Sequence, residues 1–148
     1  MTPLKLPSYE YKLKQGEEKT LIFDALRRKY LILTPEEWVR QHFIQYIINY
    51  LNYPKSLIKV EGGLHYNSLK KRSDIVVFNH EGLPWMVIEC KSPEQKINSQ
   101  TLQQVSVYNS TLKAKYIALT NGLKHLCCII DHQKKITTSL NQFPEFCD

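Results

Sequence analysis

Glu89 and Lys91 lie two residues apart at the end of an apolar stretch, "WMVIECK" (85–91), within a chain of 148 residues. In a β-strand, residues i and i+2 face the same side, so these two charged side chains project together while Cys90 faces the other, apolar side. Asp74 begins an earlier apolar run, "DIVVF" (74–78), and a short Gly-containing loop separates the two runs. This spacing predicts a β-hairpin in which Asp74 lies opposite residues 88 to 90.

Two carboxylates and an ammonium group on one small patch point to phosphodiester hydrolysis. Neighbouring carboxylates repel each other and raise each other's pKa, and a divalent cation removes that conflict. We therefore expect Asp74 and Glu89 to bind Mg²⁺, with Mn²⁺ as a substitute. Lys91 would orient an attacking water or help to deprotonate it, and would stabilise negative charge that develops on phosphorus.

A plainer explanation of the same residues is a surface salt bridge between Glu89 and Lys91, with Asp74 at the start of a strand. Two features favour the catalytic explanation. Glu89 ends an unusually apolar strand, and Asp74 precedes its partner strand at a compatible register. In addition, the basic run Lys70-Lys71-Arg72 stands immediately before the Asp74 strand, where a phosphate backbone could arrive.

Composition sets broad limits on the class of protein. The chain is 43% hydrophobic and 23% charged, which is ordinary for a globular domain, and its length fits one domain, residues 1–148. There are 20 Lys and Arg against 14 Asp and Glu, and the formal charge of +6 favours a polyanionic partner only weakly. No apolar run is long enough to span a bilayer and the N-terminus has no signal-peptide core, so we expect a cytoplasmic protein without membrane contact.

The hydrophobic periodicity predicts the order helix, three strands, helix, two strands. The first helix covers residues 34–54, with Thr34 as N-cap and Glu37 completing a capping box. The second covers 97–113, with Asn98 or Ser99 as N-cap, and as a crossover it predicts parallel pairing of its flanking strands. A hairpin is expected at 20–33, a loose arm or edge at 1–20 and a tail at 132–148. The strands are expected at 56–64, 73–79, 83–91, 114–122 and 123–131, and the buried face of the first helix at Val39, Phe43, Tyr46, Ile47 and Tyr50.

Five segments in order carry a resemblance to a known family: "TPEEWVRQ", "KRSDIVVF", "VIECKSP", "QQVSVYN" and "ALTNG". Together they resemble the N-terminal nuclease domain of type I restriction enzyme R subunits, within the PD-(D/E)xK nuclease superfamily. The resemblance extends over roughly residues 20 to 131. It implies an α/β fold with a restriction-endonuclease-like mixed central sheet flanked by helices, and a Mg²⁺-dependent endodeoxyribonuclease. It also implies DNA and the proteins of a restriction system as partners.

The resemblance also implies roles for particular residues. Asp74 and Glu89 would bind the metal, joined by the backbone carbonyl of Cys90, and Lys91 would act on the water. Gln104 would orient the site or touch DNA from the second helix, supported by Tyr108 one turn later. The first helix would supply another acid; both Glu36 and Glu37 qualify by position, and we prefer Glu36 because it lies beside Val39 and Phe43 on a helical wheel. The expected DNA-binding residues are Lys70, Lys71, Arg72, Gln104 and Tyr108.

Two other functions fit the same sequence. One is a non-catalytic DNA-binding module of a restriction or defence complex, and the other is a protein-interaction domain with an incidental salt bridge. The chain has no Walker-type loop, so ATP-driven translocation is not expected of it. The DNA structure or sequence that is recognised stays open, as do the oligomeric state, a homodimer included, and whether the chain stands alone or in a larger complex.

Overall fold

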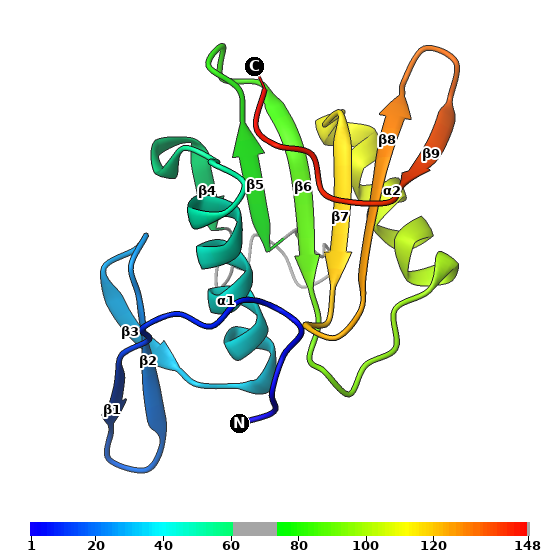
Figure 1. The fold of residues 1–148 in the computed structure, drawn as a ribbon. Coiled ribbons are helices and arrows are strands. Elements are labelled where there is room, and N and C mark those ends of the chain that lie inside the picture. The colour runs from blue at the N-terminus through cyan, green and yellow to red at the C-terminus, as the bar shows by residue number, and fades with distance from the viewer. Residues whose placement is uncertain (61–73, 148) are drawn as a thin grey trace.

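The computed structural model describes residues 1–60 and 74–147, in which two sheets and two long helices are arranged as Figure 1 shows. In chain order the elements are β1 (Leu13–Gln15), β2 (Thr20–Asp24), β3 (Lys29–Ile32), α1 (Pro35–Asn49), η1 (Lys55–Leu57), β4 (Ile58–Val60), β5 (Ile75–Phe78), β6 (Pro84–Cys90), α2 (Ser99–Leu112), β7 (Tyr116–Thr120), β8 (His125–Asp131) and β9 (Ile136–Leu140).

Within the described residues, six strands form one mixed sheet in the order β4-β5-β6-β7-β8-β9. Strands β6 and β7 are parallel because α2 connects them, whereas the other neighbouring pairs are antiparallel. The predicted crossover and the predicted α/β fold, a mixed sheet flanked by helices, are therefore confirmed. Strands β1, β2 and β3 form a separate antiparallel sheet, which contains the hairpin expected at 20–33.

The two helices cover opposite faces of the six-stranded sheet, as the alternation along β6 shows (Figure 1). Met86 and Ile88 pack in one buried cluster with Phe43 of α1. Val87, between them, packs in a second buried cluster with Val105 of α2. Burial of a side chain of this size contributes about 1.5–3 kcal/mol, so both layers stabilise the strand that carries Glu89.

Helix α1 begins where the sequence predicts and ends earlier. The Thr34 hydroxyl accepts a hydrogen bond from the Glu37 amide at 3.0 Å, and Pro35 occupies the first turn. Val39 and Phe43 are fully buried, as expected. Tyr50 was expected on the buried face, but it is 57% exposed because the helix ends at Asn49 and Tyr50 is its C-cap.

The N-terminal segment, expected as a loose arm or an edge, contains the edge strand β1, and its first residues are attached to the domain. The Lys5 amide donates to the carbonyl of Gly122 at 2.7 Å, and the Trp38 indole donates to the carbonyl of Thr2 at 2.9 Å. Gly122 has φ +85°, and a Cβ there would lie 2.7 Å from the Leu4 side chain. Only glycine suits both the turn and this close approach.

The C-terminal segment 132–148, expected as a tail, contains β9, which pairs with β8 along its whole length. Beyond β9, the Tyr53 hydroxyl donates to the carbonyl of Pro144 at 2.7 Å. The sheet thus has one strand more than predicted, beyond the last strand expected at 123–131. No helix in the described ranges combines the length and the apolar character needed to cross a bilayer.

Candidate active site

Glu89 lies in β6, and Asp74 immediately precedes β5, the neighbouring strand of the six-stranded sheet. The antiparallel register of β5 and β6 pairs Ile75 with Ile88 and Val76 with Val87. Continuing this register by one residue sets Asp74 opposite Glu89, within the range that the hairpin predicts. Asp74 is 9% exposed and the Glu89 side chain 14%, so both carboxylates are largely shielded from bulk water.

Lys91 completes the patch on the same strand end. Its Nζ lies 3.3 Å from Oε1 of Glu89, and its amide donates to the carbonyl of Thr120 at 2.8 Å, which ties it to β7. Cys90, between the two charged residues, is fully buried in the cluster on the α1 side. Burial, and then the charge of Asp74, raises the pKa of the Cys90 thiol well above its usual value. The thiol therefore stays neutral, and it is the main chain of Cys90 that can serve the site.

The electrostatics of the patch centre on Glu89. Burial raises the pKa of Glu89 to about 7, and the negative charge of Asp74 contributes in the same direction. Lys91 opposes this rise, and Glu36 adds to it slightly. The positive charge of Lys91 is thus not enough to balance the acids around it.

Glu36 brings a third carboxylate from the first turn of α1. Its pKa is raised by burial and by the charge of Asp74, and it is lowered by Arg40 and Lys91. Glu36 is therefore within electrostatic reach of the strand residues. However, its side chain is 42% exposed whereas Glu37 is buried, so the inward position that the helical wheel predicted for Glu36 is wrong, and the choice between the two acids stays a prediction. Glu37 does not complete the expected capping box. Its own carboxylate binds Arg40 and Gln41 instead, because both lie one helical turn further along α1.

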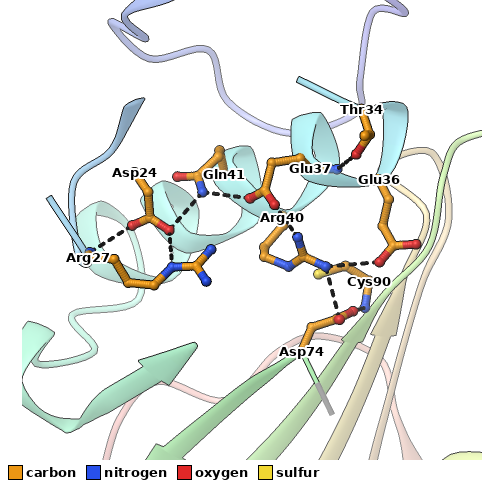
Figure 2. A network of polar contacts seen from close by, with 9 residues as sticks. All are labelled: Asp24, Arg27, Thr34, Glu36, Glu37, Arg40, Gln41, Asp74 and Cys90. Carbon is orange, nitrogen blue, oxygen red and sulfur yellow. Dashed lines mark hydrogen bonds and ion pairs between the residues drawn. The ribbon is translucent and has the colours of Figure 1, made fainter. Parts of the chain in front are cut away.

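Arg40 is the residue that sequence reasoning missed. Its Nη2 lies 2.9 Å from Oδ1 of Asp74 and 2.9 Å from Oε1 of Glu36, and its Nη1 donates to Glu37 (Figure 2). The pKa of Arg40 is raised; burial acts against the charged form, but Asp74 and Glu37 outweigh it. The spacing of Glu36 and Glu37 four and three residues before Arg40 indicates ion pairs on α1, but it gives no sign of the contact with β5.

A line of polar contacts extends from this point to the three-stranded sheet. The Gln41 amide donates to Glu37 at 2.8 Å and to Asp24 at 3.2 Å. Asp24, at the end of β2, is fully buried and also accepts from the Arg27 side chain at 2.8 Å. We call the residues from β2 to β5 the polar chain, and Figure 2 shows how they follow one another along α1. Its members are Asp24, Gln41, Glu37, Arg40 and Asp74.

The second oxygen of Asp74 is also fixed. The Cys90 amide donates to Oδ2 at 2.7 Å, across the hairpin from β6. A carboxylate oxygen has two lone pairs, so each oxygen can still face a cation while it accepts one hydrogen bond. Asp74 is thus held in one orientation from two sides, by α1 and by β6.

The other predicted site residues are placed as follows. Gln104 is exposed on α2, and none of the contacts in the described part of the chain joins it to the acidic pair. The backbone of Tyr108 lies in α2, but its side chain is outside the described part of the structure, as are Lys70, Lys71 and Arg72. The expected DNA contacts of these residues stay predictions.

The donors at this strand end fit a hard divalent cation. Asp74 and Glu89 offer carboxylate oxygens, which Mg²⁺ prefers, and a bound cation would offset both the burial and the Asp74 charge that raise the pKa of Glu89. Across residues 1–60 and 74–147, no group of three or more His, Cys, Asp or Glu side chains is arranged to hold a metal. The fit therefore rests on the carboxylate pair, with main-chain and water oxygens as the remaining ligands.

The raised pKa of Glu89 predicts a stability effect in the metal-free protein. The folded state binds the Glu89 proton more tightly than the unfolded state does, so stability falls as the pH rises from about 4.5 through about 7. Glu89→Gln should raise the free energy of unfolding at pH 8 by about 1–3 kcal/mol and change it little at pH 5. Urea unfolding in EDTA at both pH values measures this, with exposed Glu94→Gln as the control. Equal effects of Glu89→Gln at the two pH values would contradict a raised pKa of Glu89 in the folded state.

Comparison with known proteins adds a family to this geometry. The family model of the type I restriction enzyme R protein N terminus matches residues 35–144, most of the chain. Among solved structures, the chain is similar to one described as a fragment of an HsdR subunit of a type I restriction enzyme from Vibrio vulnificus YJ016, with 25% identity and a TM-score of 0.39. That similarity covers 59% of this chain and only 16% of the other. No curated protein matches the chain.

Proposed function

Because the chain belongs to the family of the type I restriction enzyme R protein N terminus, we propose that it is a divalent-metal-dependent nuclease domain that hydrolyses DNA phosphodiester bonds. One observation carries the proposal: the register of β5 and β6, continued one residue beyond the Ile75–Ile88 pair, sets Asp74 level with Glu89, and Lys91 Nζ lies 3.3 Å from Glu89. Two acids and a lysine are the residue types that a PD-(D/E)xK site uses, and their position at one partly shielded strand end supports the proposal.

In this proposal, Asp74 and Glu89 hold Mg²⁺, with the main-chain carbonyl of Cys90 as a further ligand. A bound Mg²⁺ would act as a Lewis acid on a phosphate oxygen and lower the pKa of a bound water. The protein's own part is to hold the Asp74 carboxylate in place. The Cys90 amide and Arg40 do this through hydrogen bonds to its two oxygens.

Lys91 acts on the water and on the phosphate. The main-chain hydrogen bond to Thr120 fixes its backbone, and the ion pair holds its ammonium group beside Glu89, so less ordering is needed when substrate arrives. There it would orient the nucleophile and stabilise negative charge as it develops on phosphorus. In the same proposal, Glu36, whose pKa is raised by burial and then by the charge of Asp74, would accept a hydrogen bond from this water.

DNA is the proposed substrate. A family of restriction enzyme domains is expected to work on DNA within a restriction system, and the overall charge of +6 agrees with a polyanion. The proposed backbone contacts are the basic run before Asp74 and the residues on α2, which are Lys70, Lys71, Arg72, Gln104 and Tyr108.

The direct test is metal-dependent cleavage by the purified chain. Supercoiled circular DNA and single-stranded DNA are incubated with the protein in millimolar Mg²⁺, millimolar Mn²⁺ or EDTA, and products are separated on gels. We expect nicked or linear products with either metal and none with EDTA. Salt-dependent binding without cleavage under all conditions would instead favour the DNA-binding module. If the protein neither cleaves nor binds DNA, and Mn²⁺ does not raise its melting temperature, the result would favour a protein-interaction domain.

A further inference from the structure

Arg40 is surrounded by more negative charge than it can balance. Its guanidinium contacts the carboxylates of Glu36, Glu37 and Asp74, and its side chain is 8% exposed. One positive charge thus stands among three acidic groups at the mouth of the proposed metal site. Removal of a charge from such a buried group is strongly destabilising, because its partners stay behind unpaired.

The same side chain is incompletely satisfied. Its Nε is buried and, among the described residues, has no hydrogen-bond partner. Buried polar groups in folded proteins usually have a hydrogen-bond partner, so a buried arginine donor without one needs an explanation other than fold stability. Here the two terminal nitrogens of the guanidinium, Nη1 and Nη2, both donate to carboxylates. The same orientation leaves the Nε–H group without an acceptor among the described residues.

Nη2 is shared between the helix and the strand. It lies 2.9 Å from Oε1 of Glu36 and also 2.9 Å from Oδ1 of Asp74. If Asp74 turned Oδ1 toward a cation, the guanidinium would still keep Glu36 and Glu37. Figure 2 shows Arg40 among all three carboxylates, so two of its partners would remain if the contact with Asp74 were given up.

We propose that Arg40 is a positioning residue that serves as the internal counterion of the acidic site. It holds Asp74 Oδ1 before a divalent cation binds, and it competes with that cation afterwards. The inference rests on the proposed function, because it takes Asp74 as a metal ligand. The positive charge of Arg40 next to Asp74 Oδ1, a proposed ligand oxygen, would therefore limit the affinity of the site for metal.

The proposal predicts an increase in affinity on mutation, which a purely structural role does not. Arg40→Gln removes the competing charge, so Mn²⁺ should bind at least about tenfold more tightly, although the metal-free protein melts at a lower temperature. Arg40→Lys keeps the charge without the fork, and its Mn²⁺ affinity should stay near that of the wild type. Arg28→Gln, which removes an exposed positive charge from the β2–β3 turn, is the matched control and should change neither quantity.

The experiment is a calorimetric titration of each protein with MnCl₂, together with melting curves in EDTA and in Mn²⁺. Weaker Mn²⁺ binding by both Arg40→Gln and Arg40→Lys, with a wild type that binds, would overturn the counterion role alone. Absence of Mn²⁺ binding in every protein, wild type included, would remove the metal site and with it the proposed function. Should Arg40→Gln fail to fold, the double variant Arg40→Gln/Glu37→Gln, which also removes one of the unpaired acids, is tested for the same tighter binding.

Discussion

Asp74→Asn is expected to lower metal-dependent DNA cleavage by about 100- to 1,000-fold or more, and Lys91→Gln to do the same for a different reason. The Asp74 carboxylate supplies negative charge to the proposed cation, and asparagine removes that charge with little change in shape. Lys91 supplies positive charge to the phosphate and the water, which glutamine cannot. Single-turnover cleavage of supercoiled DNA in Mg²⁺, with the metal concentration varied, measures both losses.

Metal binding separates the two roles. Asp74→Asn should lose most of the rise in melting temperature that Mn²⁺ gives the wild type, since a ligand is gone. Lys91→Gln should keep that rise or enlarge it, because a positive charge beside Glu89 has been removed. The controls are Glu94→Gln and Lys96→Gln, two exposed residues a few positions further along, which should cleave as the wild type does. If Asp74→Asn or Lys91→Gln cleaves DNA as fast as the wild type, the substituted residue has no role in the proposed mechanism.

The acidic pair could be predicted from the sequence because it depends on one local hairpin. The turn between β5 and β6 is short, and alternation along each strand then fixes which side chains share a face. Asp74 and Glu89 therefore meet for reasons that lie within about twenty residues of chain. The crossover helix α2 was predictable in the same way, from an N-cap at Asn98 and a regular apolar spacing.

Arg40 and the polar chain could not be predicted in this way, since their contacts are long-range. The bond between Arg40 and Asp74 joins residues 34 apart, and its existence depends on how α1 lies across the sheet. From the sequence alone, Glu37 fitted a capping role and Arg40 had no assigned role. The Glu37 carboxylate binds Arg40 instead, because a carboxylate shielded from water takes the strongest donor within reach. Strand β9 was not predicted for a related reason. Its sequence, "ITTSL", is largely exposed and has no strong hydrophobic pattern, and it forms a strand because it pairs with β8.

Asp24 is where the polar chain should matter most for stability. Asp24→Ala is expected to lower the free energy of unfolding by about 3–5 kcal/mol. The carboxylate is fully buried and accepts from the amides of Leu26 and Arg27, the Arg27 side chain and Gln41, so alanine leaves these donors unpaired. Burial opposes the ionisation of Asp24, but the bonds from Arg27 and Gln41 hold its pKa below the usual value. The contribution should therefore be present at neutral pH and be lost as acid protonates the carboxylate, below about pH 4.

Asp131 offers a matched control in the other hairpin. Like Asp24, it is the last residue of a strand and accepts from the amides two and three residues ahead, at Gln133 and Lys134, but it is exposed. Asp131→Ala should therefore cost only about 1 kcal/mol, because water replaces the lost acceptor. Urea unfolding of both variants at pH 7 makes the comparison. If both variants lose the same free energy of unfolding, the Asp24 carboxylate stabilises only its own turn. The polar chain would then not connect the three-stranded sheet to α1 and the acidic site. If Asp24→Ala costs several times more, the excess measures that connection, which begins outside the segment matched by the family and ends at Asp74.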